Sequence, residues 1–206
     1  MTESASVTTP AGLRRVIARF GIAPRPALVL VGGAGQMSPE DAARVRDVMR
    51  NSVIPVVRSL RAAIVDGGTD SGVMRIAADL RRATDTWPLV GVTARGTIGT
   101  TGNRAPLETR HTHHLRVPGA NWGDESPWLA ATGDCIASDN ASVTVLCNGG
   151  EGSRRDVDCS VAAGRRVLVA RGTGRLADQL KRAHLVTPID PSALGDALRY
   201  ALRMRS

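Results

Sequence analysis

The sequence is poor in aromatic residues, which make up 2% of its 206 residues. A hydrophobic core must therefore be built mainly from Ala, Val, Leu and Ile. No apolar run approaches the roughly 20 residues that a membrane-spanning helix needs, and the opening MTESASVTTP lacks the charged-then-apolar pattern of a signal peptide. Together with a hydrophobic content of 42%, these absences predict a globular cytoplasmic protein.

Cysteine and lysine are also scarce. Cys135, Cys147 and Cys159 contain no CxxC pair, and their odd number argues against a disulfide framework. Lys181 is the single lysine, so the formal net charge of +8 comes almost entirely from arginine. The planar guanidinium suits phosphate and carboxylate groups, and this charge fits either a solvated surface or a phosphate-binding one. No basic run, aromatic RNA-binding motif or zinc finger supports sequence-specific nucleic-acid binding.

Short apolar segments alternate with helical patterns along the chain. The apolar runs at 27–31, 62–65, 89–93, 142–147 and 166–170 show little alternation, which is typical of strands covered on both faces. Helical patterns occupy 38–60, with Pro55 kinking or dividing the helix, and then 71–84, 154–164, 174–184 and 191–204. This order predicts an α/β fold, a Rossmann-like, doubly wound, mainly parallel sheet in three αβα layers.

We expect a single domain. It covers residues 11–206, preceded by a flexible N-terminus at 1–10. Residues 94–128 are rich in loop signals and are expected to form a lid or an inserted hairpin, in which Trp122 lies.

Four glycine-rich loops follow four of the predicted strands. Right-handed crossovers between parallel strands place such loops at one edge of the sheet. Glycine lets the backbone approach a ligand, and the helix N-terminus behind each loop suits a phosphate. The alternative for each loop is tight packing between strand and helix, and for Arg175 it is an exposed surface position. The candidate phosphate- and ligand-binding residues are Gly32, Gly33, Ala34, Gly68, Thr69, Asp70, Ser71, Gly72, Gly149, Gly150, Glu151, Gly152, Ser153, Gly172, Thr173, Gly174 and Arg175.

No loop has the spacing of a P-loop or of the NAD fingerprint. Instead, the blocks ALVLVGGAG, AAIVDGGTDSGVM, LETRHTHHLRV and the stretch from SVTVLC to GTGRLAD occur in an order that resembles the SLOG domain of melastatin-type TRP channels, in its prokaryotic stand-alone form. The resemblance covers about residues 27–180. It implies a Rossmann-like domain that binds a nucleotide, and relatives sense ADP-ribose or cyclic compounds made from NAD. We therefore expect a cytoplasmic binding or sensor domain for ADP-ribose, AMP or a related nucleotide, with no required cofactor.

The stretch Asn148–Asp156, NGGEGSRRD, is similar to the P-G-G-x-G-T-x-x-E motif of LOG-type phosphoribohydrolases in the same superfamily. Asp156 stands at the position of the catalytic glutamate, on an arm one methylene shorter, and Ser153 replaces the threonine. Asp156 is therefore the candidate catalytic residue, and ribose binding or a first-turn role on the helix dipole are its alternatives. A nucleoside-monophosphate phosphoribohydrolase is the alternative function, and a structural protein with vestigial loops is a third.

The histidine cluster does not supply enough ligands for a metal site. His111 and His113 would face one side of a strand and His114 the other. Without a third ligand nearby they do not make a zinc site, so no metal is expected. The resemblance suggests a ligand-facing or structural role for His113. Many doubly wound proteins of this size dimerise, so we expect a homo-oligomer, and we expect no membrane partner.

Overall fold

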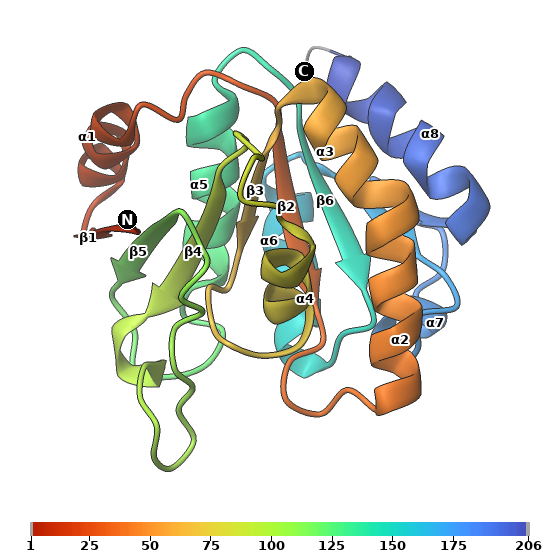
Figure 1. Ribbon diagram of the computed structural model, residues 1–206, viewed down its shortest axis with the longest axis horizontal. Helices are drawn as coiled ribbons and strands as arrows, with labels where there is room; N and C mark the ends of the chain where they lie inside the picture. The colour runs from red at the N-terminus through yellow and green to blue at the C-terminus, as the bar shows by residue number, and fades with distance from the viewer. Residues whose placement is uncertain (1, 205–206) are drawn as a thin grey trace.

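The computed structural model describes residues 2–204. At the centre of the fold is a sheet of eight parallel strands (Figure 1). The sheet order is β1-β5-β4-β3-β2-β6-β7-β8, and every neighbouring pair is parallel. The prediction of a Rossmann-like doubly wound fold is therefore confirmed. The strands are β1 (Glu3–Ser6), β2 (Ala27–Gly32), β3 (Ala63–Asp66), β4 (Leu89–Ala94), β5 (His113–Val117), β6 (Ser142–Cys147), β7 (Arg166–Ala170) and β8 (Val186–Ile189).

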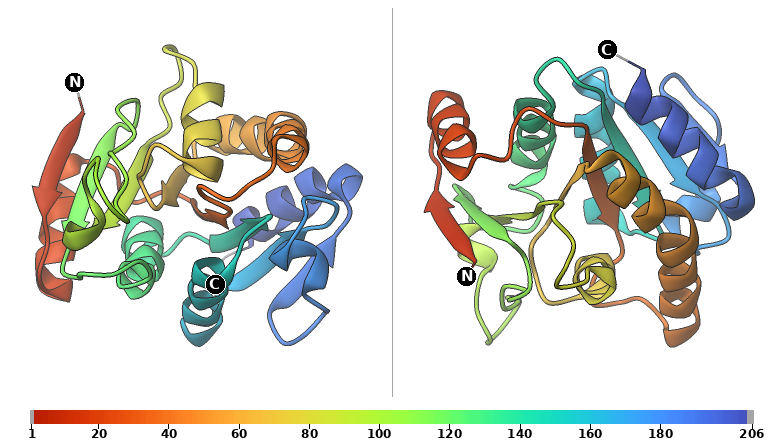
Figure 2. Two further views of the ribbon diagram at one scale, coloured as in Figure 1. Left: turned by 90° about the horizontal axis from the view of Figure 1, so that it is seen from below. Right: turned by 45° about the horizontal axis from the view of Figure 1, so that its top comes forward.

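Helices cover both faces of this sheet, so the domain has three layers (Figures 1 and 2). One layer holds α2 (Pro39–Val48), α3 (Ile54–Leu60), α4 (Gly72–Leu80) and α8 (Pro191–Arg203). The other holds α1 (Pro10–Phe20), α5 (Ser126–Ala137), α6 (Glu151–Ala162) and the short α7 (Leu176–Gln179). No helix within residues 2–204 has both the length and the apolar character that crossing a bilayer requires.

The strand sequences are apolar throughout because each strand serves two cores. In β2, Leu28 and Leu30 pack into the core beneath α2, α3, α4 and α8, whereas Val29 and Val31 pack into the core beneath α1, α5 and α6. All four side chains are buried. A strand with this burial shows no alternation in its sequence, which is why the inner strands were predictable.

The helix predicted over 38–60 is divided near its proline. Ser38 caps α2 by accepting a hydrogen bond from the Asp41 N–H at 3.1 Å. A π-helical turn, Met49–Val53, then joins α2 to α3, whose second residue is Pro55. Proline lacks the N–H that a continuous α-helix would need there.

Three expectations about the chain differ from the structure. Residues 1–10 were expected to be flexible, but β1 pairs with β5, and Thr9 caps α1 through the Gly12 N–H at 3.1 Å. Residue 1 lies outside the described residues. The segment 94–128 contains β5, and the helix predicted over 174–184 shrinks to α7. The missed strands β1 and β8 lie at the two edges of the sheet, where polar residues interrupt the apolar pattern.

The topology creates one switch point. The chain leaves β2 towards β3 on one side, and β6 later returns to pair with β2 on the other side. The arrowheads of β2 and β6 point to the same edge in Figure 1, and the four glycine loops follow β2, β3, β6 and β7 there. The prediction that these loops share the carboxyl edge is confirmed. In open parallel sheets, ligands bind in the crevice at this point.

Candidate ligand-binding pocket

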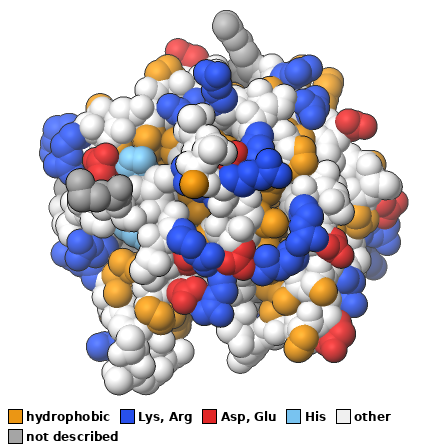
Figure 3. All heavy atoms as spheres, in the orientation of Figure 1, with side chains coloured by type: hydrophobic (Ala, Val, Ile, Leu, Met, Phe, Trp, Pro, Cys, Tyr) orange, Lys and Arg blue, Asp and Glu red, His pale blue; other side chains and the backbone are white. Residues whose placement is uncertain are grey.

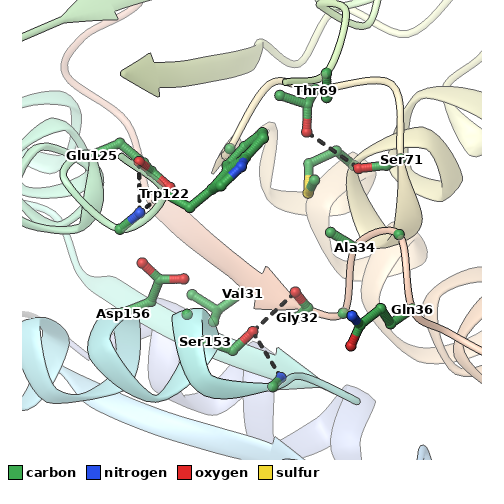
Figure 4. A pocket seen from close by; sticks show the side chains of 18 of the residues that line it. Val31, Gly32, Ala34, Gln36, Thr69, Ser71, Trp122, Glu125, Ser153 and Asp156 are labelled. Atoms are coloured by element: carbon green, nitrogen blue, oxygen red, sulfur yellow. Dashed lines mark hydrogen bonds between the residues drawn. The ribbon is translucent and has the colours of Figure 1, made fainter. Parts of the chain in front are cut away.

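A cavity of about 510 Å³ lies at the switch point, between the loops that follow β2, β3 and β6 (Figure 4). This volume is in the range of small-molecule and nucleotide sites. Its floor is apolar, with Leu30, Val31 and Leu129 from β2 and α5. The predicted residues that line it are Gly32, Gly33, Ala34, Thr69, Ser71, Gly150, Gly152, Ser153, Asp156 and Arg175.

The first and third glycine loops are held together at this cavity. The Ser153 hydroxyl, in the first turn of α6, donates to the Gly32 carbonyl at 3.0 Å and accepts from the Gly150 N–H at 3.4 Å. Ser153 therefore fixes the distance between the ends of β2 and β6. The first N–H groups of α6 have no partner within the helix, and they carry the positive end of its dipole. This end of the cavity is suited to an anion.

Arg175 adds a cation at the same end. Its guanidinium packs against Gly150, where a Cβ would lie 2.8 Å from Arg175 Nη2. Within residues 2–204, its side chain makes no salt bridge or hydrogen bond. An unpaired guanidinium beside a helix N-terminus on a cavity wall is the arrangement that binds a phosphate or a carboxylate.

Several other arginines on the molecule have partners within the chain. Blue and red side chains alternate over the middle of the face in Figure 3. Asp79 on α4 pairs with both Arg46 and Arg110, and Asp70 pairs with Arg75 at 2.7 Å. These ion pairs support the interpretation of much of the basic charge as a solvated surface. Asp70, a predicted ligand residue, is engaged in its ion pair and does not line the cavity.

The fourth glycine loop supports the site from outside the cavity. The Thr173 hydroxyl donates to the Ala170 carbonyl at 2.7 Å and accepts from the Asn148 N–H at 2.8 Å. The N–H groups of Gly172 and Gly174 donate to the Asp178 carboxylate at 2.6 and 2.9 Å. The structure therefore places Gly172, Thr173 and Gly174 in a structural brace, and of this loop only Arg175 reaches the cavity.

Tight packing also explains several predicted glycines. Gly68 has φ of 70°, and a Cβ there would lie 2.7 Å from the Gly91 Cα. Gly72 has φ of 48°, and its Cβ would lie 1.9 Å from the Gly33 carbonyl oxygen. The surplus glycine of DGGTDSG therefore lets β3, α4 and the first loop approach one another closely. Gly149 and Glu151 also lie outside the cavity lining.

The histidine cluster lies away from the cavity. His113 begins β5, at the amino edge of the sheet, and its ring contacts Phe20 at 4.7 Å between centroids. The expected sharing of one strand face by His111 and His113 was wrong, because His111 precedes the strand and stacks on His114 at 5.2 Å. Within residues 2–204, no group of three or more His, Cys, Asp or Glu residues is arranged to hold a metal ion.

His111 belongs to a buried ionic cluster beneath the second glycine loop. Its Nε2 lies 2.7 Å from Asp66 Oδ1, and its Nδ1 lies 3.0 Å from Glu108 Oε2. Burial alone would lower the pKa of His111, but these two carboxylates outweigh it and raise the pKa to about 9. Burial likewise opposes ionisation of Glu108, yet His111 and Arg110 lower its pKa to about 2. We call Asp66, Glu108 and His111 the buried ionic cluster, and the exposed Arg110 pairs with Glu108 from its outer side.

Asp156 is in the opposite situation. It lies three residues beyond Ser153, on the same face of α6, and points into the cavity (Figure 4). Its Oδ1 is buried and has no hydrogen-bond partner within the described part of the chain. Burial is the main cause that raises the pKa of Asp156 to about 7. The charge of Glu125 adds to this rise, and the nearby Ser126 hydroxyl and Arg155 act against it. A carboxyl group of this kind at a cavity is typical of a functional residue.

Sequence reasoning missed the far wall of the cavity, which comes mainly from the 94–128 segment. The Trp122 side chain is 39% exposed and points into the cavity, and its Nε1 donates to the Asn103 carbonyl at 2.9 Å (Figure 4). This bond joins two loops at the cavity wall. A tryptophan in a loop-rich segment of an aromatic-poor chain was the available signal. The missed lining residues are Leu30, Val31, Gly35, Gln36, Gly67, Met74, Asn103, Arg104, Ala105, Trp122, Gly123, Glu125 and Leu129.

The sequence profile of a family described as SLOG in TRPM, prokaryote, matches residues 25–201. The chain belongs to this family. A search of curated proteins gave no match. Among solved structures, the X-ray structure of TM1055, Northeast Structural Genomics Consortium target VT76, is similar with a TM-score of 0.59 and 21% identity, over 84% of this chain and 96% of that one. At this identity the likeness supports the fold alone.

Proposed function

We propose that this SLOG-family domain binds a nucleotide of the ADP-ribose type, and that it acts as a ligand sensor. The observation that carries the proposal is the Arg175 guanidinium, which is unpaired within residues 2–204 and lies beside the N-terminus of α6, on the wall of a cavity at the switch point. A phosphate there would satisfy free helix N–H groups and the guanidinium together. The family of the domain supports a nucleotide-related role.

The remaining cavity walls suit the rest of a nucleotide. The Trp122 ring offers a flat apolar surface on which a base can stack. Asp156 offers a carboxyl group to ribose hydroxyls. The cavity of about 510 Å³ is in the size range of cofactor and drug sites.

A thermal-shift panel of ADP-ribose, cyclic ADP-ribose, AMP and NAD tests the proposal. Occupation at a hundred times Kd should stabilise the fold by about 2.7 kcal/mol. Ribose 5-phosphate and inorganic phosphate in the same panel would separate nucleotide binding from simple anion binding. A flat response to every nucleotide, checked by calorimetry, would contradict the sensor function.

The second candidate function is that of a phosphoribohydrolase, and the buried Asp156 favours it. A carboxyl group with a pKa near 7 can exchange a proton with a leaving base or stabilise an oxocarbenium-like ribose. We rank this function second because the motif differs from the LOG pattern at three positions, Asn148, Ser153 and Asp156. Chromatography of AMP incubated with the protein should show no steady adenine release. Adenine release that Asp156→Asn abolishes would reverse the ranking.

A further inference from the structure

The outer face of α8 presents large apolar side chains to solvent. Within residues 2–204, the exposed side chains of this kind are Trp122, Tyr200 and Met204. Trp122 lines the cavity, whereas Tyr200 and Met204 lie one turn apart at the end of α8 and are 61% and 44% exposed. Tyr200 is the only tyrosine of an aromatic-poor chain. Tyrosine and methionine are enriched in protein–protein interfaces, so this face is a candidate contact surface.

The inner face of α8 is held firmly by the fold. Its buried side chains are Leu194, Leu198, Ala201 and Leu202. They pack into the core that α8 shares with α3, β6 and β7, and Arg199 at the flank donates to the Ser59 hydroxyl at 3.2 Å. Figures 1 and 2 show α8 at the periphery of its helix layer. The outer face is therefore a fixed surface, since both flanks of the helix are anchored.

Two opposite charges stand on either side of Tyr200 on this outer face. Asp196 lies one turn before it and Arg203 one turn after it, and both are exposed. At 3.6 residues per turn, the three side chains fall within about 60° of the helix circumference. Along the axis, Asp196 lies about 6 Å before Tyr200 and Arg203 about 4.5 Å after it. Neither charge forms an ion pair within the described part of the chain.

We propose that this face binds a second copy of the chain, and that the two α8 helices pack antiparallel about a twofold axis at Tyr200. A twofold interface brings the same patch of both copies together, so the patch must be complementary to itself. Reversal of the helix direction places Asp196 opposite Arg203 of the partner subunit, because the two residues lie at similar distances from Tyr200. The two tyrosine rings then meet at the axis, with an ion pair on each side.

The neighbouring elements favour contact through helices over contact through strands. The sheet ends at β8, and this edge strand contains Pro188, which lacks the N–H that pairing with another strand would use. Beside α8, helix α3 exposes the small side chains of Pro55 and Ser59, which allow a second helix to approach closely. No residue of α8 lines the cavity, so the dimer leaves the ligand-binding pocket open.

Sedimentation velocity of the purified chain over a range of concentrations tests this interface. The parent should form a dimer. Asp196→Arg and Arg203→Asp each place like charges opposite one another at both ends of the interface, and each should raise the dimer dissociation constant at least about tenfold. The double variant Asp196→Arg/Arg203→Asp restores opposite charges with their signs exchanged, so it should dimerise like the parent. Tyr200→Ser should weaken the dimer, because the apolar contact at the axis is lost.

Asp158→Arg on α6 and Arg14→Asp on α1 are matched controls, because they reverse exposed charges in the other helix layer. Both should dimerise like the parent, and circular dichroism should show that every variant is folded. A parent that is monomeric at all concentrations would overturn the proposal. A dimer that neither Asp196→Arg nor Arg203→Asp weakens would also overturn it, and so would a double variant that is no more dimeric than the single ones.

Discussion

The two acidic clusters of this domain illustrate two uses of buried charge. In the buried ionic cluster, the Glu108 carboxylate is paired with His111 and Arg110, and its pKa falls to about 2. At the cavity, Asp156 is half-buried, its Oδ1 has no hydrogen-bond partner within the described residues, and its pKa rises to about 7. A carboxyl group that is paired with cations inside the chain supports the fold. One that lines a cavity, with no ion pair inside the described residues, is available to a ligand.

This contrast predicts that the two clusters respond differently to mutation. Changes in the buried ionic cluster should alter stability, whereas changes at the cavity should alter ligand binding. The predictions below test that division, beginning with the largest expected effect.

Removing the imidazole of the buried ionic cluster should have the largest effect. His111→Ala leaves Asp66 and Glu108 buried without the cation between them. Loss of one partner from a buried charge cluster costs about 3–5 kcal/mol in the free energy of unfolding. Urea denaturation at neutral pH measures it, and His184→Ala, at an exposed histidine, is the control. Equal stability of the two variants would show that the cluster contributes little to the fold.

At the cavity, Arg175→Ala should weaken nucleotide binding by about 1.5–3 kcal/mol, the usual contribution of a charge-assisted hydrogen bond. The free energy of unfolding should change little, because the Arg175 side chain forms no ion pair within the described residues. Arg175→Lys should recover only part of the affinity, since the bidentate fork is lost. Arg171→Ala provides a control at an exposed arginine outside the cavity. If Arg175→Ala binds the nucleotide as tightly as the parent, Arg175 is an exposed surface residue that does not contribute to ligand binding.

Trp122→Ala should weaken binding of base-containing ligands by about 1–3 kcal/mol, the usual contribution of a stacked base. Ribose 5-phosphate, which has no base, should bind to the parent and the variant equally. Trp122→Phe should retain most of the affinity for AMP. Calorimetry with both ligands measures the difference, and an equal loss for AMP and ribose 5-phosphate would indicate a general distortion of the loops instead of stacking.

The smallest expected effect concerns stability and pH. The folded-state pKa of Asp156 is raised from 3.8 to about 7, so the folded protein binds more protons and loses stability as pH rises across that range. Asp156→Asn removes this loss. It should match the parent near pH 4 and exceed its free energy of unfolding by about 1–2 kcal/mol near pH 8. If the variant is less stable than the parent at both pH values, Asp156 stabilises the fold and the prediction is wrong.

The buried ionic cluster loses its contribution at both ends of the pH range, whereas Asp156 destabilises the fold only as pH rises. The pKa of His111 is raised from 6.5 to about 9, so its contribution is complete below about pH 6.5 and is lost as pH rises through about 9. The pKa of Glu108 is lowered from 4.5 to about 2, so its contribution is lost as pH falls through that range.

The sequence predicted the centre of the fold better than its edges. Runs such as ALVLV carry the signature of strands buried on both faces, and the glycine loops after them fall at one sheet edge by topology. Edge strands such as ESAS at Glu3–Ser6 are short and polar, so their sequences resemble loops. Their strand state depends on pairing with distant residues, as in the alignment of Glu3 with His113.

The cavity was predictable only in part for a similar reason. Local sequence marks a glycine that follows a strand, but it does not say whether the glycine faces a ligand or a neighbouring backbone. Gly72 faces the Gly33 carbonyl, whereas Gly150 lies beneath Arg175 at the cavity. Glu125 and Trp122 come from a segment without a regular pattern, and tertiary contacts bring them to the site.

A crystal structure of the chain with ADP-ribose bound would test the central claim most directly. We expect a phosphate at the first turn of α6, within hydrogen-bond distance of the Arg175 guanidinium, and the ribose beside Asp156. We also expect no contact between the ligand and Gly172 or Thr173, which brace the site from outside the cavity. A ligand whose phosphates lie away from α6, with Arg175 still exposed to solvent, would contradict the account.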